Sequence, residues 1–290
     1  MRQDTSAGLL AGKTFLITGG SGGLAGGCAR RLAADGAALL LMARSVAPLE
    51  ARCAELREAY PGLRAEYHAG DATRATDVQA ALAKAHALQG CLDGIVAVAG
   101  GGSGYRPLLL LDDEALTESF NKNVVSAFLA IKYGVPLMQP GGAIVCISST
   151  AAKINFTWLA PYCAAKAAIE SLVRSAAEEL SGAGIRVNAV RPGLTRAGGT
   201  GTRFFPDPAI MAKFQAEIPL LRPGIPAGEP DDIGAAVRYL CGPESAWVTG
   251  QSFAVDGGNE LRKAPDLGML VEKGLGKAAF EAVKRGKPLA

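Results

Sequence analysis

The stretch KTFLITGGSGGLAGGCARRLAADG, residues 13–36, decides the fold. It opens with a short apolar run, 13–18, that predicts a buried β-strand, and it ends with 24–36, whose composition is typical of a helix. Four of the five residues between these two segments are glycine, so the chain can make a tight turn there. The stretch therefore predicts one strand–turn–helix unit of an α/β protein.

The same alternation of short apolar runs and longer amphipathic stretches continues along the chain. It predicts parallel strands joined by right-handed crossover helices. We expect an α/β fold in which residues 13–260 form a single domain, a doubly wound, Rossmann-type, mostly parallel sheet with helices on both faces. An N-terminal arm, 1–12, precedes this domain and a C-terminal extension, 261–290, follows it. The further strands are expected at 37–43, 64–69, 93–98, 142–148, 185–190 and 252–255, and the further helices at 74–88, 112–137, 161–181 and 230–241.

The composition fits a folded protein with a full core, because 49% of the 290 residues are hydrophobic and 20% are charged. The net charge of +3 is too small to indicate nucleic-acid binding. Residues 261–290 hold seven basic and three acidic side chains, a net of +4, which leaves −1 for the rest of the chain. This basic extension is either a solvated terminus, a lid or a subunit contact.

The cysteine and histidine content predicts no metal site. Six cysteines are scattered without a CxxC pair, and neither His68 nor His86 lies at ligand spacing from a cysteine. The N-terminal segment MRQDTSAGLLAGK lacks the apolar core of a signal peptide, and no apolar run approaches the ~20 residues of a membrane span. We therefore expect a cytoplasmic protein without a membrane span.

The glycine-rich turn lies where a doubly wound sheet binds a dinucleotide. Glycines let the backbone approach the pyrophosphate, and the following helix supplies amide donors and the positive end of its dipole. The second strand ends at Arg44 with no carboxylate beside it. An acidic residue there would bind the ribose of NAD, whereas arginine attracts the 2′-phosphate of NADP, so we expect NADP unless Arg44 is an ordinary surface charge. The expected contacts of the turn are Gly19, Ser21, Gly22, Gly23 and Leu24.

A second group of residues has the chemistry of proton transfer. Tyr162 and Lys166 are four apart in an expected helix and therefore share one face. A phenol has a pKa of about 10, and a neighbouring ammonium and an oxidised nicotinamide would both favour its ionised form. Tyr162 can thus serve as a general acid and base. Ser149 follows the strand 142–148 at the edge where ligands bind, and its hydroxyl can hold a substrate oxygen on which charge develops.

These motifs together resemble the short-chain dehydrogenase/reductase family over nearly the whole of residues 13–258. The resemblance implies an enzyme that transfers a hydride between a nicotinamide cofactor and a carbonyl/alcohol pair. It also implies a homodimer or homotetramer whose main interface uses the helices at 112–137 and 161–181. The motifs that carry it are the glycine-rich turn, Ser148-Ser149, YCAAK at 162–166, RVNAVRPG at 186–193 and VDGG at 255–258.

The resemblance extends the candidate site beyond what spacing alone reaches. It implies that Asn123 joins Ser149, Tyr162 and Lys166 as a catalytic group, holding a water linked to the lysine. It implies that Asp71 contacts the adenine. The other cofactor contacts that it implies are Ala99, Gly100, Tyr162, Lys166, Pro192, Gly193 and Thr195.

Three positions depart from the family pattern. Ala25 stands at the third glycine of the turn, which residues 20–25 accommodate as GxGxxA. AVAG at 97–100 replaces the usual Asn-Asn-Ala-Gly, so two side-chain contacts that steady the fourth strand are missing. Ala197 stands where a threonine is usual, and Thr195 is the substitute for the contact with the nicotinamide amide.

Residues 194–221 lie where the family carries its substrate lid. Their apolar side chains either close over an apolar ligand or pack the lid onto the core. The first interpretation predicts a bulky or apolar small-molecule carbonyl or alcohol, such as a steroid, terpenoid or acyl thioester. The alternatives are a 3-oxoacyl-thioester reductase and a non-catalytic NADP-binding regulator or scaffold. The apolar residues are Phe204, Phe205, Ile210, Met211, Phe214 and Ile218.

Overall fold

The computed structural model describes residues 8–102, 104–197, 207–220 and 227–287. Seven strands form one sheet in the order β3-β2-β1-β4-β5-β6-β7, and every neighbouring pair is parallel. The expected α/β fold is therefore confirmed. The strands are β1 (Thr14–Thr18), β2 (Ala38–Ala43), β3 (Ala65–Ala69), β4 (Leu92–Ala97), β5 (Met138–Ile147), β6 (Arg186–Pro192) and β7 (Ser252–Val255).

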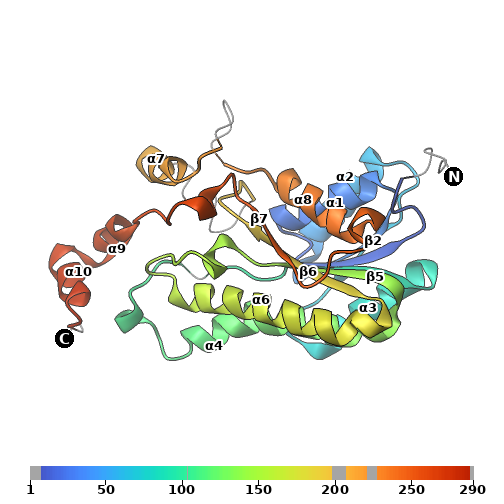
Figure 1. Ribbon diagram of the computed structural model, residues 1–290, viewed down its shortest axis with the longest axis horizontal. Helices are drawn as coiled ribbons and strands as arrows, with labels where there is room; N and C mark the ends of the chain where they lie inside the picture. The colour runs from blue at the N-terminus through green and yellow to red at the C-terminus, as the bar shows by residue number, and fades with distance from the viewer. Residues whose placement is uncertain (1–7, 103, 198–206, 221–226, 288–290) are drawn as a thin grey trace.

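Helices cover both faces of this sheet (Figure 1). One face carries α1, α2 and α8, and the other carries α3, α5 and α6. Two further helices, α9 and α10, lie beyond one end of the sheet, near α7. The helices are α1 (Gly23–Ala34), α2 (Val46–Ala59), α3 (Ala75–Gln89), α4 (Ala115–Phe120), α5 (Ser126–Gly134), α6 (Ala160–Leu180), α7 (Pro208–Ala216), α8 (Pro230–Cys241), α9 (Gly268–Leu275) and α10 (Lys277–Lys284).

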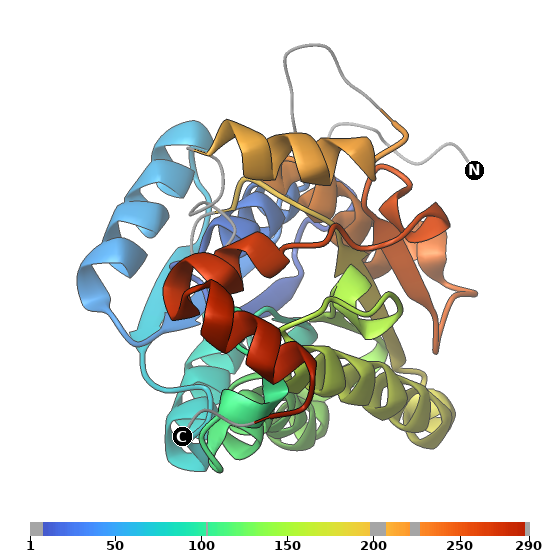
Figure 2. The ribbon, with the colours of Figure 1, turned by 90° about the vertical axis from the view of Figure 1, so that its left-hand side faces the viewer.

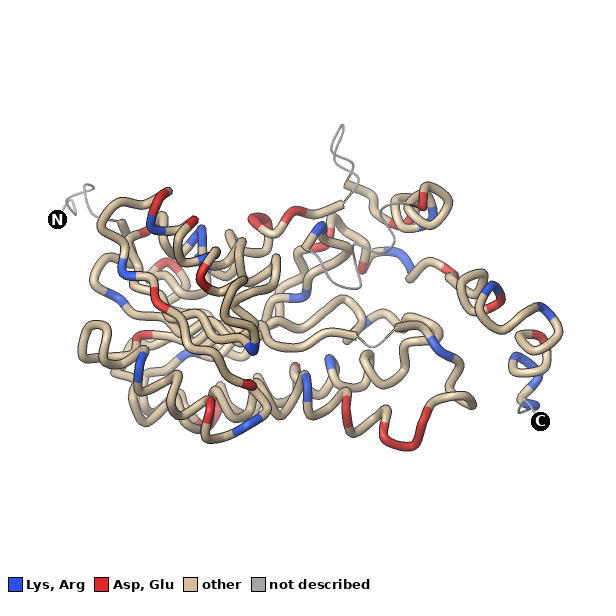
Figure 3. The backbone as a smooth tube through the Cα atoms, turned by 180° about the vertical axis from the view of Figure 1, so that it is seen from behind, with Lys and Arg blue, Asp and Glu red and all other residues tan. Residues whose placement is uncertain are grey.

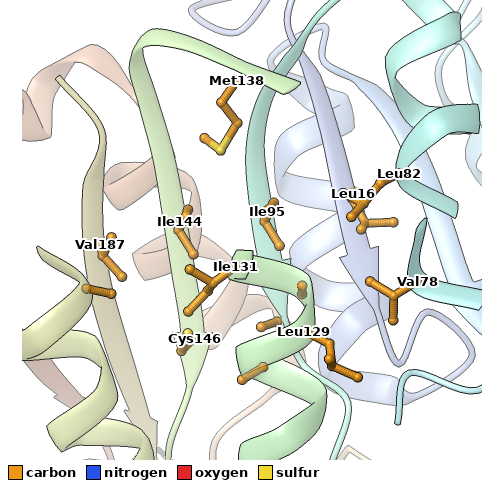
Figure 4. Close-up of a cluster of buried hydrophobic side chains, with 14 of the residues drawn as sticks. Leu16, Val78, Leu82, Ile95, Leu129, Ile131, Met138, Ile144, Cys146 and Val187 are labelled. Carbon is orange, nitrogen blue, oxygen red and sulfur yellow. The ribbon is translucent and has the colours of Figure 1, made fainter. Parts of the chain in front are cut away.

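The core lies in two layers because successive side chains of a strand point to opposite faces. In β1, Leu16 packs toward α3 and α5, whereas its neighbours Phe15 and Ile17 pack toward α1 and α8. Figure 4 shows the first layer, in which Leu16, Ile95 and Ile144 come from three adjacent strands. All of these side chains are fully buried, so strands that are apolar throughout form the centre of the sheet.

The position of the site follows from the strand order. The chain runs outward from β1 through β2 to β3, then returns to add β4, β5, β6 and β7 on the other side of β1. The connections after β1 and β4 therefore leave in opposite directions, which opens a crevice at the carboxyl ends of these strands. Ligands bind at such a reversal point in open α/β sheets.

Several elements differ from the sequence-based expectations. Helix α2 was not predicted, although Leu49, Cys53 and Leu56 have helical spacing and are buried. The helix expected at 112–137 is divided, because a π-helical turn, Asn121–Val125, separates α4 from α5. Part of the expected lid loop is helix α7.

Candidate functional site

A cavity of about 1040 Å³ opens at the carboxyl ends of β1, β4, β5 and β6. Its volume is at the upper end of the range that holds a small-molecule ligand. Glycines line one part of it, and aromatic and aliphatic side chains line another. The expected site residues that line it are Gly19, Gly22, Gly23, Leu24, Ala99, Gly100, Ser149, Tyr162, Lys166, Pro192, Gly193 and Thr195.

The glycine-rich turn joins β1 to α1 and is closely covered by another segment. Gly19 has φ +68°, a left-handed conformation that favours glycine. A Cβ on Gly23 would lie 2.1 Å from the carbonyl oxygen of Ala197, which accepts a hydrogen bond from the Gly23 amide at 3.1 Å. Ala197 thus leaves no room for a side chain at Gly23, while Gly19 and Gly22 line the cavity, where a cofactor phosphate could approach the backbone.

The end of β4 is held by a residue that the sequence interpretation overlooked. The Thr18 hydroxyl oxygen accepts hydrogen bonds from the amides of Val98 and Ala99, both at 3.1 Å. These bonds steady the strand end where the family's two asparagines are absent. A polar residue at the last position of an otherwise apolar strand was the signal in the sequence, because a buried hydroxyl needs a partner.

Asn123 lies in the π-helical turn and is fully buried. Its Oδ1 accepts from the Gly101 amide at 2.9 Å, and its Nδ2 donates to the carbonyl oxygens of Ser119 at 2.9 Å and Gly101 at 3.2 Å. A Cβ on Gly100 would lie 2.5 Å from the Asn123 Oδ1 and 3.5 Å from the Lys166 Nζ. Asn123 therefore holds the loop after β4 against the lysine.

Ser149, Tyr162 and Lys166 come together from two elements. Ser149 follows the end of β5 and its hydroxyl oxygen accepts from the Ala151 amide at 3.2 Å. Tyr162 and Lys166 lie in the first turns of α6, with the lysine Nζ 5.6 Å from the centre of the tyrosine ring. The Lys166 Nζ donates to the carbonyl oxygen of Ile147 at 2.8 Å, and the side chain of this lysine is almost completely buried.

Burial has the largest effect on the pKa values of Tyr162 and Lys166. Burial raises the pKa of Tyr162, and a hydrogen bond with Ser149 lowers it by less. Burial also lowers the pKa of Lys166 to about 8. Within the protein itself, burial sets the pKa of the phenol, rather than the ammonium that was expected to lower it, because desolvation disfavours the charged form of each group.

Arg191, Glu170 and Glu260 form a network of charged residues. Arg191, which precedes Pro192, donates from Nε and Nη2 to Glu260 at 2.6 and 3.0 Å and from Nη1 to Glu170 at 3.4 Å. Burial alone would lower the pKa of Arg191, but the two carboxylates raise it overall. Glu170 also accepts from the Ser148 hydroxyl at 3.1 Å. The network thus joins the residue after β5 to α6, to β6 and to Glu260, the last residue before the C-terminal extension.

The expected contacts for the adenosine part of a cofactor lie away from the cavity lining. Arg44 is exposed and directly follows β2; Ser21, an expected contact of the glycine-rich turn, is also exposed and outside the cavity lining. Asp71 follows β3 and accepts from the Thr73 amide at 2.9 Å. Hydrogen bonds from Thr73 lower the pKa of Asp71, and the Arg44 charge adds to this effect. The two side chains therefore lie close enough to interact at the outer end of the crevice.

The turn after β6 completes the glycine side of the cavity. The Gly193 amide donates to the carbonyl oxygen of Val255 at 3.1 Å. Thr195 is buried, and its hydroxyl donates to the carbonyl oxygen of Gly193 at 3.1 Å. Thr195 thus lies within this turn and lines the cavity.

The apolar part of the cavity contains residues that the sequence analysis did not assign. Phe156 and Leu159 come from the loop between Ser149 and Tyr162, Tyr105 comes from the loop after β4, and Leu270 comes from α9. Phe214, in the expected lid, also lines the cavity. Phe204 and Phe205 lie outside the described residues. Loop residues have no periodic pattern, so only the family's lid position gave a sequence signal for this region.

Comparisons with known proteins show which family this chain resembles. A family model described as enoyl-(acyl carrier protein) reductase matches residues 19–260. The 2-(S)-hydroxypropyl-CoM dehydrogenase 3 of Xanthobacter autotrophicus is 35% identical over 86% of this chain and 97% of its own length.

Two solved structures extend the comparison. A short-chain type dehydrogenase/reductase from Mycobacterium ulcerans has a TM-score of 0.88 and 30% identity over 94% of this chain and 98% of its own. A short chain dehydrogenase from Burkholderia cenocepacia, solved in complex with NADP, has a TM-score of 0.78 and 29% identity over 86% of this chain and 98% of its own.

The chain belongs to the short-chain dehydrogenase/reductase family. It is an oxidoreductase that uses a nicotinamide cofactor and acts on alcohol or carbonyl groups. None of the helices in the described part of the chain combines the length and apolar character that a membrane crossing needs.

Proposed function

We propose that this enzyme transfers a hydride between NADP and a carbonyl/alcohol pair whose remaining part is bulky or apolar, with Tyr162 as the general acid and base. One observation carries the proposal. The phenol of Tyr162 lies in the same cavity as the glycine-rich turn, the Ser149 hydroxyl and a ring of apolar side chains. A cofactor on the turn and a substrate against the apolar side chains would both reach the phenol.

Side chains of the protein hold the substrate oxygen and transfer the proton that it gains or loses. In the direction of reduction, the Ser149 hydroxyl donates a hydrogen bond to the substrate oxygen, and the Tyr162 phenol gives its proton to the same oxygen. In the direction of oxidation, the phenolate takes the alcohol proton back. A bound nicotinamide would supply or accept the hydride, and its oxidised form would add a positive charge that favours the phenolate. Lys166 adds a second positive charge when it is protonated.

The residues present fit a dinucleotide. Gly19, Gly22 and Gly23 line the cavity, so no side chain of these three positions stands between the backbone and a bound phosphate, and the first turn of α1 lies against the cavity. We assign the pyrophosphate to Gly19, Ser21, Gly22, Gly23 and Leu24. We assign the adenine to Asp71 and the nicotinamide half to Ala99, Gly100, Tyr162, Lys166, Pro192, Gly193 and Thr195.

Arg44 is the proposed determinant of cofactor choice. It is exposed directly after β2, where an acidic residue would favour NAD. We expect Arg44→Asp to shift the ratio of kcat/KM for NADPH over NADH toward NADH by at least about tenfold, because a lost ion pair becomes a repulsion. Arg64→Asp, at another exposed arginine, is the control and should leave the ratio unchanged. A wild-type enzyme that prefers NADH tenfold would contradict the assignment.

The substrate class is tested by a spectrophotometric screen of NADPH and NADH oxidation against steroid, terpenoid and aliphatic ketones, acyl-carrier 3-oxo thioesters and small sugars. The reverse screen uses the corresponding alcohols. We expect turnover of apolar ketones. Exclusive turnover of sugars or polyols would contradict the proposal, and exclusive turnover of carrier-bound thioesters would favour the acyl reductase. Cofactor binding without any turnover would favour a regulator.

We also propose that the enzyme is a homodimer or homotetramer that uses α4, α5 and α6 as its main contact. Phe128 in α5 and Leu116 in α4 are exposed apolar residues, which supports an interface on this side. Light scattering coupled to size-exclusion chromatography measures the assembly, and a monomer at micromolar concentration would contradict the proposal.

A further inference from the structure

The C-terminal extension forms two helices that lie against the candidate site. The family model ends at residue 260, and α9 and α10 lie beyond it. Figure 2 shows this pair in front of the sheet, next to α7, and the pair carries side chains of both charges (Figure 3). Leu267, Val271, Phe280 and Val283 are nevertheless buried. The described part of the extension is therefore packed onto the domain rather than solvated.

The first part of the extension packs against α7. Leu267 is 1% exposed and forms a buried cluster with Ile210 and Phe214 of α7. The Lys213 Nζ donates to the carbonyl oxygen of Asp266 at 3.1 Å. Earlier in the chain, the Asn259 Nδ2 donates to the carbonyl oxygen of Glu217 at 2.9 Å. Helix α7 and the extension therefore cover the cavity as one packed unit.

The second part of the extension rests on the loop that leads to α6. The ring of Phe280 in α10 lies 5.5 Å from the ring of Trp158 at an angle of 59°. A Cβ on Gly268 would lie 3.0 Å from the Phe280 ring, so α9 and α10 also pack closely on each other. Trp158 has φ +69°, an unusual conformation for a bulky residue. Its neighbour Leu159 lines the cavity.

Leu270 reaches the cavity between these two contacts. It lines the cavity together with Phe156, Phe214 and Tyr105, and it packs on the Leu267 cluster. Leu270 is half-buried, whereas Met269 beside it points to solvent with 42% exposure. Because Leu270 is neither buried in the core nor fully exposed, its apolar side chain is available for contact with a ligand in the cavity.

We propose that α9 is a wall of the substrate pocket and that Leu270 limits the length of the apolar part of the substrate. This inference rests on the proposed function, because it assigns Phe214 and Leu270 to the substrate rather than to the cofactor. The occupant is an apolar chain or ring attached to the carbonyl carbon. The wall keeps its place because Trp158 supports α10 and α7 supports the segment before α9.

The test measures how pocket length changes with the side chain at position 270. The probes are 2-butanone, 2-hexanone, 2-octanone and 2-decanone, titrated by calorimetry into the full-length protein saturated with NADP⁺, where no hydride is available and no turnover occurs. Turnover of the same ketones with NADPH is measured separately. The variants are Leu270→Ala, Leu270→Phe and Leu270→Trp, and Met269→Trp is the control for adding a large ring to the exposed side of α9.

We expect Leu270→Ala to move the tightest-binding ketone to a longer chain, and Leu270→Phe or Leu270→Trp to move it to a shorter one. For ketones beyond the new limit, the Kd should rise at least about tenfold, the usual effect of a few methylenes in an apolar pocket. Met269→Trp should keep the wild-type order. The thermal unfolding midpoint shows which variants are folded, and Leu270→Phe still tests the inference if Leu270→Trp does not fold.

The outcomes separate this inference from the proposed function. If the wild type and all folded Leu270 variants show the same dependence of Kd on ketone chain length, α9 is not a wall of the substrate pocket, even if every ketone is reduced. Binding of none of the ketones overturns the inference as well. A chain-length limit that follows position 270 supports the wall, even if NADPH is never oxidised, and in that case only the proposed turnover fails.

Discussion

Tyr162 and Lys166 lie one helical turn apart, and burial moves their pKa values in opposite directions. It raises the pKa of the phenol and lowers that of the ammonium to about 8. The buried lysine retains a backbone partner, the carbonyl oxygen of Ile147. The protein thus holds both groups in their neutral forms more readily than water does. Under the proposed function, the positive charge of an oxidised nicotinamide has to offset this effect on the phenol.

The burial of Lys166 should make the stability of the wild type depend on pH, and Lys166→Met should lack this dependence. The pKa of Lys166 falls from 10.5 in the unfolded chain to about 8 in the folded protein. Between these values the unfolded state binds the extra proton, so wild-type stability rises with pH. We expect the wild type to gain on the order of 2 kcal/mol relative to Lys166→Met between about pH 7 and about pH 10.

Urea unfolding of both proteins at several pH values measures this difference. Lys122→Met removes an exposed lysine that also lines the cavity, and it should show no such trend. A difference between the wild type and Lys166→Met that stays constant with pH would show that the lysine is not desolvated in the folded protein.

Sequence reasoning reached the polar residues of the site but not its apolar boundary. Tyr162, Lys166 and Ser149 belong to motifs whose spacing places them on α6 and at the end of β5, and all three line one cavity. Leu270 and Leu159 are ordinary leucines whose place depends on how distant segments pack. The sign of the Tyr162 pKa shift was also out of reach, because it depends on burial rather than on neighbours in the sequence.

At the scale of the elements, the Arg191 network connects β6 and α6 to Glu260, the last residue before the C-terminal extension. A guanidinium that is 10% exposed contacts two carboxylates, on Glu260 and Glu170, that are 9% and 15% exposed. Removing one member of a buried pair leaves the other charge without full compensation. The network therefore fixes the end of β6, where Pro192 and Gly193 turn toward the cavity.

Glu260→Gln should destabilise the protein by about 2 kcal/mol, because the only carboxylate that Arg191 then contacts is that of Glu170, at 3.4 Å. Glu281→Gln is the matched control. Its carboxylate pairs with Lys284 at 3.4 Å on the exposed surface of α10, and such pairs contribute little. Chemical unfolding of the two variants compares them directly. Equal and small effects would show that the buried network does not stabilise the fold.

At the scale of the whole molecule, the sheet order accounts for the place of the site. β1 and β4 are neighbours although two strand–helix units separate them in the sequence. The crevice between the ends of β1 and β4 keeps its shape because the sheet beneath it is rigid. The two buried core layers on the faces of the sheet provide this rigidity. α7 and α9 then close the crevice from above the strand ends (Figure 2).

Val187→Ala in β6 tests how strongly this sheet depends on its core. Val187 is fully buried in the layer of Figure 4, and loss of two methyl groups there should cost about 2 kcal/mol of unfolding free energy. Val46→Ala in α2 makes the same chemical change at 45% exposure and should cost less than about 0.5 kcal/mol. Urea unfolding of both variants gives the comparison. Similar losses would contradict the assignment of Val187 to a tightly packed layer.

The fold could be predicted from the sequence because β1, β2 and β4 are apolar runs of strand length separated by helical stretches. All seven expected strands are present, with boundaries that shift by a few residues. β5 begins earlier than expected, at Met138, because a register irregularity lets that residue pair with Leu92. The two helices of the extension escaped prediction, since their short apolar stripes are buried by contacts with distant segments such as α7 and Trp158 and with each other.

The most direct test of the proposed chemistry is the rate of hydride transfer in Tyr162→Phe, measured by stopped-flow absorbance of NADPH with a ketone that the wild type reduces. The variant keeps the ring and loses only the phenolic hydroxyl. We expect the rate to fall by about 100-fold or more, the usual contribution of general acid catalysis, while the Kd for NADPH changes little. A folded, NADPH-loaded Tyr162→Phe enzyme that reduces the ketone at the wild-type rate would contradict the assignment of the proton to Tyr162.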